Sequence, residues 1–167
     1  MTMAVMIFSL LGAAVLQALS PSTPLFAQAR APFLLSVVIY YALTREQNLV
    51  LTAACLAGLV QDSLSRIPLG YSAVCYCAVG AVISWCHEMV FNRSLLTHLL
   101  VGGISGVFAS LLLFGLLWRG AVVSAGWEIV LMKAVGTGLL AMITTPIVFR
   151  LTDKLDRFLG NVPSEER

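Results

Sequence analysis

Charged residues are scarce in this chain, and their scarcity excludes most classes of soluble protein. Only 11% of the 167 residues are Asp, Glu, Lys or Arg, whereas 59% are hydrophobic. A typical soluble domain carries about 25% charged and about 45–50% apolar residues, and a soluble monomer exposes only a few hundred Å² of contiguous apolar surface. An apolar excess of this size cannot be hidden from water. The sequence therefore predicts an integral membrane protein in a lipid bilayer.

The sequence also lacks the marks of nucleic-acid binding and of catalysis. The net charge is only +2, and no basic run interleaved with aromatic residues is present. The patterns H-E-x-x-H and G-x-S-x-G are absent, as is a Gly-rich phosphate loop followed by Lys. The four cysteines fall in apolar stretches, which favours small buried hydrophobic residues over a metal or redox site. We therefore expect no enzyme activity, no cofactor, no metal and no nucleic-acid partner.

Long apolar runs without strict alternation indicate helices, because lipid offers the backbone no hydrogen-bond partner. A transmembrane helix needs about 20 residues. The sequence predicts an all-α membrane protein with six transmembrane helices in a single polytopic domain, short loops, and a charged cytoplasmic tail over 150–167. The second and third spans are short, so they either extend by snorkelling of their flanking charges or are shielded by neighbouring helices. The predicted spans are 3–19, 32–44, 48–61, 69–87, 94–118 and 131–149.

The two ends of the chain are expected on the cytoplasmic side. The first apolar segment has no basic n-region and no A-x-A-like cleavage site, so it is interpreted as a retained first span rather than a signal peptide. An even number of spans places both termini on one side. The compact cluster "RLTDKLDR", residues 150–157, directly follows the last span, and the positive-inside rule places it in the cytoplasm.

One charged pair beside a rigid turn is the main candidate site, within "GLVQDSLSRIPLG". Asp62 and Arg66 are four residues apart and share a helix face. Pro68 disfavours a helical conformation for the residue before it, and Gly70 supplies the freedom to turn. One interpretation is a helix end with an intrahelical ion pair and a sharp re-entry. The other is a charged outer edge of the helix ends at which a partner protein docks.

Other polar residues leave further alternatives. Glu128 and Lys133 lie at a membrane interface, or else the last span starts earlier and buries both, which would make Lys133 a functional candidate. His98 is either a metal or proton site or, more simply, a histidine near the headgroups. A short turn after the fourth span is predicted to have a polar edge, which consists of His87, Glu88 and Arg93.

Two sets of glycines predict close helix packing. Gly102, Gly103 and Gly106 form "GGxxG" in the fifth span, and Gly136 and Gly138 lie in the sixth. Small residues on one face let helix backbones approach each other in a membrane. We interpret both sets as packing surfaces, within the chain or toward a partner helix.

Two stretches of the sequence resemble a known family. The segments "APFLLSVVIYYAL" (31–43) and "GLVQDSLSRIPLGYSAVCYCAVGAVISW" (58–85) are similar to the core of MreD, the rod-shape-determining membrane protein of bacteria. Arg66 is not among the positions carried over. The matching positions are Pro32, Tyr40, Gly58, Leu59, Asp62, Pro68, Leu69 and Gly70.

The resemblance implies a function as a non-enzymatic scaffold of the cell-elongation (rod) complex in the bacterial inner membrane. Such a subunit binds the bitopic protein MreC, whose periplasmic part engages the class B transpeptidase. The complex is also linked to the MreB cytoskeleton and the RodA glycosyltransferase, and it helps control cell shape and peptidoglycan synthesis. The resemblance further implies a fold like the S component of energy-coupling-factor transporters. That likeness supplies the alternative function, a substrate-binding subunit of a vitamin or small-molecule transporter.

Overall fold

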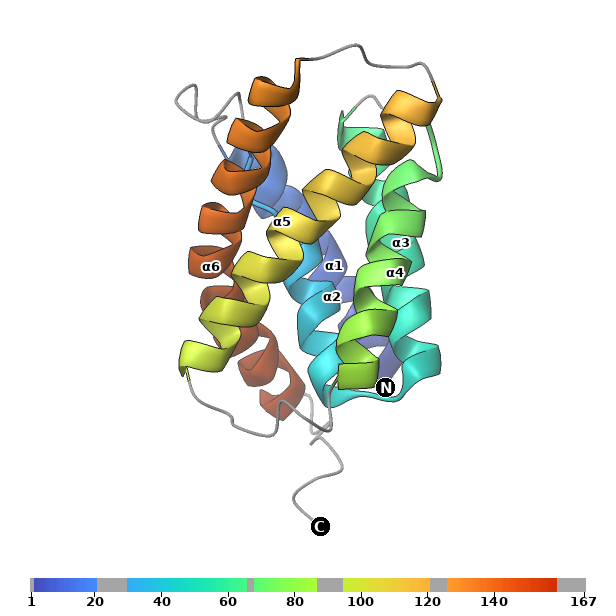
Figure 1. Cartoon of the computed structure of the whole chain (residues 1–167). Helices are drawn as coiled ribbons and strands as arrows, with labels where there is room; N and C mark the ends of the chain where they lie inside the picture. Colours follow the sequence, from blue (N-terminus) through green and yellow to red (C-terminus); the bar gives the residue numbers. More distant parts are fainter. Residues whose placement is uncertain (1, 21–29, 66–67, 87–94, 121–125, 159–167) are drawn as a thin grey trace.

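The computed structural model describes residues 2–20, 30–65, 68–86, 95–120 and 126–158, and all regular secondary structure in these ranges is α-helical. In Figure 1 the helices form a bundle in which α5 crosses the front obliquely, and α1 begins at the same end at which α6 finishes. The six helices are α1 (Thr2–Leu19), α2 (Phe33–Thr44), α3 (Gln47–Ser65), α4 (Tyr71–Cys86), α5 (Leu95–Arg119) and α6 (Trp127–Phe158).

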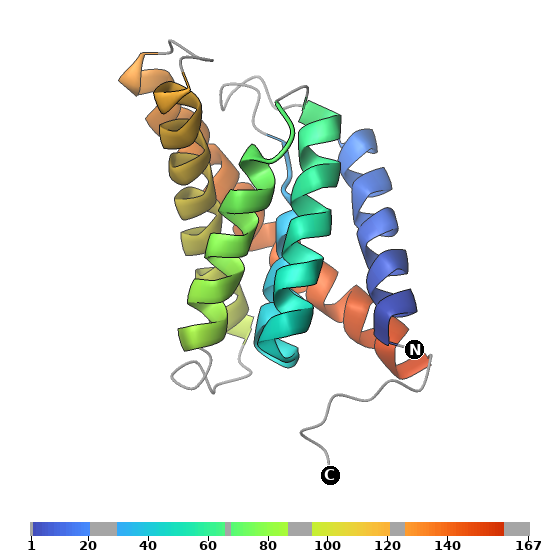
Figure 2. The same cartoon turned by 90° about the vertical axis from the view of Figure 1, so that its right-hand side faces the viewer.

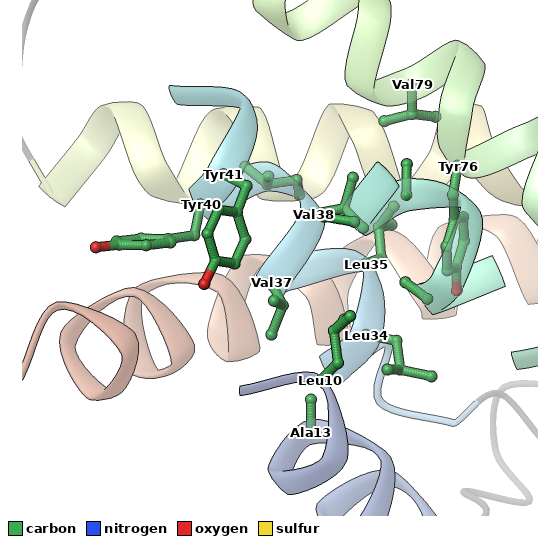
Figure 3. Close-up of a cluster of buried hydrophobic side chains, with 14 of the residues drawn as sticks. Leu10, Ala13, Leu34, Leu35, Val37, Val38, Tyr40, Tyr41, Tyr76 and Val79 are labelled. Carbon is green, nitrogen blue, oxygen red and sulfur yellow. The ribbon is translucent and has the colours of Figure 1, made fainter. Parts of the chain in front are cut away.

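The short helix α2 is the centre of the bundle. Its sequence, FLLSVVIYYALT, is apolar on all sides, and residues 34–42 are buried without a break. A helix that is apolar all round is typically buried, and α2 contacts each of the other five helices. Figure 3 shows its side chains reaching Leu10 and Ala13 of α1 on one side and Tyr76 and Val79 of α4 on another. Of the two explanations for its shortness, shielding by neighbouring helices is the one observed.

The prediction of six transmembrane helices requires a correction. Three helical segments in the described residues are long and apolar enough to cross a membrane, namely Gln47–Ser65, Thr97–Arg119 and Trp127–Asp156. The other described apolar segments are shorter, at Val5–Leu19, Phe33–Thr44 and Tyr71–Cys86. The physical reason is clearest for α2, whose 12 residues cover only about 18 Å of a hydrocarbon core about 30 Å thick. Protein rather than lipid surrounds it.

Two helices are longer than the sequence predicted. The third was expected to end near residue 61, but α3 continues through Asp62 to Ser65. The sixth was expected over 131–149, but α6 begins at Trp127 and ends at Phe158. The charged segment that was predicted as a tail from residue 150 therefore begins as a continuation of α6. Figure 2 shows α6 running behind the other helices to end beside the start of α1.

The outer surface of the bundle carries many large apolar side chains. Large hydrophobic side chains are exposed on the five helices around α2, among them Phe8, Leu56, Trp85, Ile104 and Ile143. Exposed apolar surface over a whole helical bundle is the arrangement expected in lipid, where the solvent itself is apolar. The fold therefore supports membrane insertion independently of composition.

Candidate functional site

A fully buried carboxylate joins α3 to the beginning of α4. Asp62 has an exposed fraction of 0%. Its Oδ2 accepts a hydrogen bond from the Gly70 amide at 2.7 Å, and its Oδ1 accepts one from the Ser72 amide at 3.0 Å. The first amides of a helix have no acceptor within the helix, and a negative charge beside them also interacts favourably with the helix dipole. Asp62 thus caps α4 from a neighbouring helix.

A glycine one turn earlier in α3 makes this capping geometry accessible. Gly58 lies four residues before Asp62 and therefore on the same helix face. A Cβ atom at Gly58 would overlap the backbone of Ser72 and Ala73. The turn itself needs Gly70, whose φ of +106° strains any residue with a side chain. We call Gly58, Asp62, Gly70 and Ser72 the hairpin clasp.

The clasp changes the interpretation of the charged pair. The predicted partner of Asp62, Arg66, lies outside the described residues, so the ion pair remains a prediction. Asp62 does not form part of an exposed charged edge, because backbone amides of α4 surround its carboxylate. Pro68 and Leu69, by contrast, are exposed, Leu69 with a fraction of 70%. Among the residues of this turn that the structure describes, the exposed side chains, those of Pro68 and Leu69, are apolar.

A second side-chain cap lies at the start of α2. Pro32 is the N-cap residue of α2 and supplies no side-chain hydrogen bond. Gln17 of α1 supplies it instead, because its Oε1 accepts a hydrogen bond from the Leu34 amide at 3.2 Å. Its Nε2 donates to Oε1 of Gln61, whose own Nε2 donates to Ser65 Oγ at 2.8 Å. Side chains from neighbouring helices therefore cap both α2 and α4, a role for Gln17 that the sequence analysis missed.

A buried ionic cluster lies at the opposite end of α2, where α6 extends beyond its predicted end. Asp156 is fully buried. Its Oδ2 accepts a hydrogen bond from the Tyr40 hydroxyl at 2.7 Å and forms an ion pair with Arg45 Nη2 at 3.3 Å. Asp156 was expected in the charged cytoplasmic tail. The available signal was the spacing of Val148, Thr152 and Asp156, which continues one buried face of α6 in steps of four residues.

The hydroxyl of Tyr40 is expected to contribute measurably to stability. Tyr40→Phe removes a hydrogen bond to a buried carboxylate, so we expect the free energy of unfolding to fall by about 2 kcal/mol. Tyr41→Phe is the matched control, because the Tyr41 hydroxyl lies 3.5 Å from Ser9 Oγ, at the limit of hydrogen bonding, and its loss should cost less than about 1 kcal/mol. Thermal unfolding in detergent measures both. Equal effects of the two substitutions would contradict the assignment.

The predicted packing glycines lie where α5 contacts α6. A Cβ at Gly103 would lie 2.6 Å from Met142 Cγ, and one at Gly106 would lie 2.7 Å from Ala141 Cβ. Gly102 is equally close to Thr145 of α6, and Gly138 to Val107 of α5. Gly136 is buried on α6. Gly102, Gly103, Gly106 and Gly138 therefore pack within the chain, where they bring α5 and α6 together.

Comparison with protein families decides the identity of this arrangement. The family model for the rod shape-determining protein MreD matches residues 1–155. The chain belongs to the MreD family. The match confirms the resemblance found in residues 31–43 and 58–85, and it extends over the C-terminal helices as well. Membership implies a role in rod shape determination, and MreD is a shape-determining protein rather than a known enzyme family.

No curated protein and no solved structure matches the chain. The likeness to an energy-coupling-factor S component, which the resemblance implied, is therefore unsupported. Gly58, Asp62 and Gly70, which carried the resemblance to MreD, are three of the four residues of the hairpin clasp. In this MreD-family chain, these three positions of the signature lie at the junction between α3 and α4.

The remaining polar candidates do not assemble into a site in the part of the chain that is described. His98 is buried, and its ring centroid lies 4.1 Å from that of Phe149. No group of three His, Cys, Asp or Glu residues suited to a metal occurs among the described residues. Two cysteines, Cys55 and Cys86, are exposed, contrary to the expectation that all are buried. The predicted polar turn lies outside the described residues and comprises His87, Glu88 and Arg93.

The sixth helix starts earlier than residue 131, as the alternative interpretation held, but Glu128 and Lys133 are not buried. α6 begins at Trp127, so Glu128 and Lys133 are both helical. Both side chains are exposed. Lys133 is therefore not the buried intramembrane cation that would have marked a functional site.

Proposed function

We propose that this chain is a non-enzymatic scaffold subunit of the cell-elongation complex in the bacterial inner membrane, where it binds an MreC-type bitopic partner. The observation that carries the proposal is the hairpin clasp. Its polar groups are used in holding α3 against α4, and what the junction leaves exposed is the apolar turn at Pro68 and Leu69. The clasp, which contains three positions of the family signature, thus fixes the position of the exposed residues Pro68 and Leu69.

The clasp geometry argues for contact with a partner and against chemistry. A catalytic group must reach its substrate, whereas Asp62 is fully buried and already hydrogen-bonded to Gly70 and Ser72. An exposed apolar residue held by a rigid junction suits protein contact, because burying a Leu side chain contributes about 1.5–3 kcal/mol. Through the partner, the complex would include the class B transpeptidase, RodA and MreB, as family resemblance implies.

The proposed topology places both termini in the cytoplasm and the Pro68–Leu69 turn on the periplasmic side. It is supported by the basic residues near the end of α6, where Arg150 and Lys154 are exposed. It also agrees with α1 beginning and α6 ending at one end of the bundle (Figure 1). Labelling of a cysteine introduced at Ser65, in a variant without native cysteines, tests the orientation. Labelling from the cytoplasmic side alone would reverse it.

The exposed turn provides the test of partner binding. Leu69→Gln leaves the clasp intact, so we expect normal folding but about a ten-fold fall in the amount of MreC-type partner that co-purifies. Leu19→Gln is the matched control, because Leu19 is 76% exposed at the last residue of α1, on the other side of the bundle from α4 (Figure 2). Undiminished co-purification of the Leu69→Gln variant would contradict docking at this turn.

No pocket found among the described residues supports the alternative function as a transporter subunit that binds a small molecule. A site for a small polar molecule needs several convergent polar groups in one pocket. A groove of about 490 Å³ between α5 and α6 is lined wholly by apolar side chains and glycines, including Leu100, Phe108, Val135 and Met142. We therefore do not propose a small-molecule site there.

A further inference from the structure

A second groove lies between the start of α4 and the end of α5. Its volume is about 480 Å³, and the two helices are in contact. Gly70 adds no side chain to it, and a Cβ built there meets no atom within 4 Å. The lining residues are Leu69, Gly70, Tyr71, Val74, Leu116, Arg119 and Gly120.

The mouth of this groove is at the level expected for lipid headgroups. Trp118, beside Arg119 at the end of α5, is 68% exposed, and Trp127 at the start of α6 is 64% exposed. Tryptophan is enriched at membrane–water interfaces. Leu116 lies three residues before Arg119 and Val74 three residues after Tyr71, so each is about 4.5 Å further along its helix from the mouth. The groove therefore runs from a polar mouth to apolar walls.

A positive charge marks the mouth, and no described carboxylate forms an ion pair with it. Arg119 is exposed, and the ion pair recorded among the described residues joins Arg45 and Asp156 at the other end of α2. The neighbouring carboxylate, Asp62, is buried and hydrogen-bonded to Gly70. The helix dipole favours a cation in the last turn of α5, but the dipole does not account for apolar walls leading away from it. A guanidinium group binds phosphate oxygens in a bidentate manner.

We propose that this groove binds an anionic phospholipid. Its phosphodiester lies on the Arg119 guanidinium, and an acyl chain follows the apolar walls at Val74 and Leu116. The guanidinium supplies the charge and the hydrogen-bond donors that a phosphodiester requires, and the apolar walls suit an acyl chain. The inference does not depend on the proposed scaffold function, because it concerns the chain and its bilayer alone.

The test measures lipid selectivity of the purified full-length chain. The protein is placed in mixed micelles with equal phosphatidylglycerol and phosphatidylcholine, and bound lipids are counted by native mass spectrometry. A basic residue contributes about 1 kcal/mol to anionic lipid binding, so Arg119→Gln should lower the enrichment of phosphatidylglycerol about five-fold. Lys133→Gln, which removes an exposed cation outside the groove, should leave it unchanged.

Further variants and a soluble competitor distinguish a lipid from other ligands of the groove. Val74→Phe fills the apolar wall without changing charge, and it should reduce bound phosphatidylglycerol while folding is retained. Unchanged enrichment in Arg119→Gln, or an equal fall in Lys133→Gln, would overturn the proposal. Displacement of the lipid by millimolar glycerol phosphate would show a site for soluble phosphate compounds instead. Retained lipid selectivity with lost co-purification of the MreC-type partner in Arg119→Gln would assign the groove to an acidic protein segment.

Discussion

Gly58→Ala is expected to lower the free energy of unfolding by about 3 kcal/mol, although it adds a single methyl group. The new Cβ would overlap the backbone of Ser72 and Ala73 in α4. Backbone atoms cannot move aside as a flexible side chain does, so the cost should lie at the upper end of the range for overpacking. For a chain of this length such a loss corresponds to roughly 10 °C in the thermal midpoint. Thermal unfolding in detergent measures it.

Gly115→Ala is the matched control for this substitution. Gly115 lies in α5, and a Cβ there meets no atom within 4 Å. Because alanine favours a helix over glycine by about 1 kcal/mol, this variant should be as stable as the parent or slightly more stable. If both substitutions have the same effect, the close approach of α3 and α4 at Gly58 is not a determinant of stability.

Asp62→Ala is expected to destabilise the chain by about 2–3 kcal/mol. The substitution leaves the amides of Gly70 and Ser72 without their acceptor inside a buried junction, and each unsatisfied buried donor costs about 1–3 kcal/mol. Asp62→Asn retains one carbonyl oxygen, so it should lose about half as much. Glu46→Ala removes an exposed carboxylate and should change stability by less than about 0.5 kcal/mol.

The order of stability among the Asp62 variants tests whether the carboxylate is a structural cap of α4. Unfolding curves in detergent should rank stability as parent, Asp62→Asn, Asp62→Ala. If Asp62→Ala matched the parent, the carboxylate would not be a structural cap. Because Asp62 is buried, its variants report on folding, and only exposed positions such as Leu69 report on partner contact.

The helices were predictable because membrane insertion depends on composition over long segments. Apolar runs interrupted by charges, Pro68 and Gly70 predicted ends within about three residues of the observed ones for α1, α2, α4 and α5, but not for α3 and α6. The family signature was readable from Gly58 and Asp62. These features are local, since turn chemistry and hydropathy act over a few residues. The all-helical fold in the described residues and the MreD family were both confirmed.

The hydrogen-bond donors to the buried carboxylates were not predictable, because they lie at a distance in the sequence. Asp62 has its hydrogen-bond donors eight and ten residues away, across a turn. Asp156 pairs with Tyr40 and Arg45 more than 100 residues away. A carboxylate in a charged segment suggests a solvated tail unless the fold brings a buried partner to it. The same holds for α2, whose shortness acquires a reason only when five other helices surround it.

Amide hydrogen exchange at Gly70 and Ser72 tests the hairpin clasp most directly. The amides of both residues donate to Asp62, so the account predicts that Asp62→Ala accelerates their exchange at least ten-fold, while amides in the middle of α6, such as that of Thr145, change far less. A ten-fold change corresponds to about 1.4 kcal/mol of local opening free energy. Unchanged exchange at Gly70 and Ser72 in a folded Asp62→Ala protein would contradict the account.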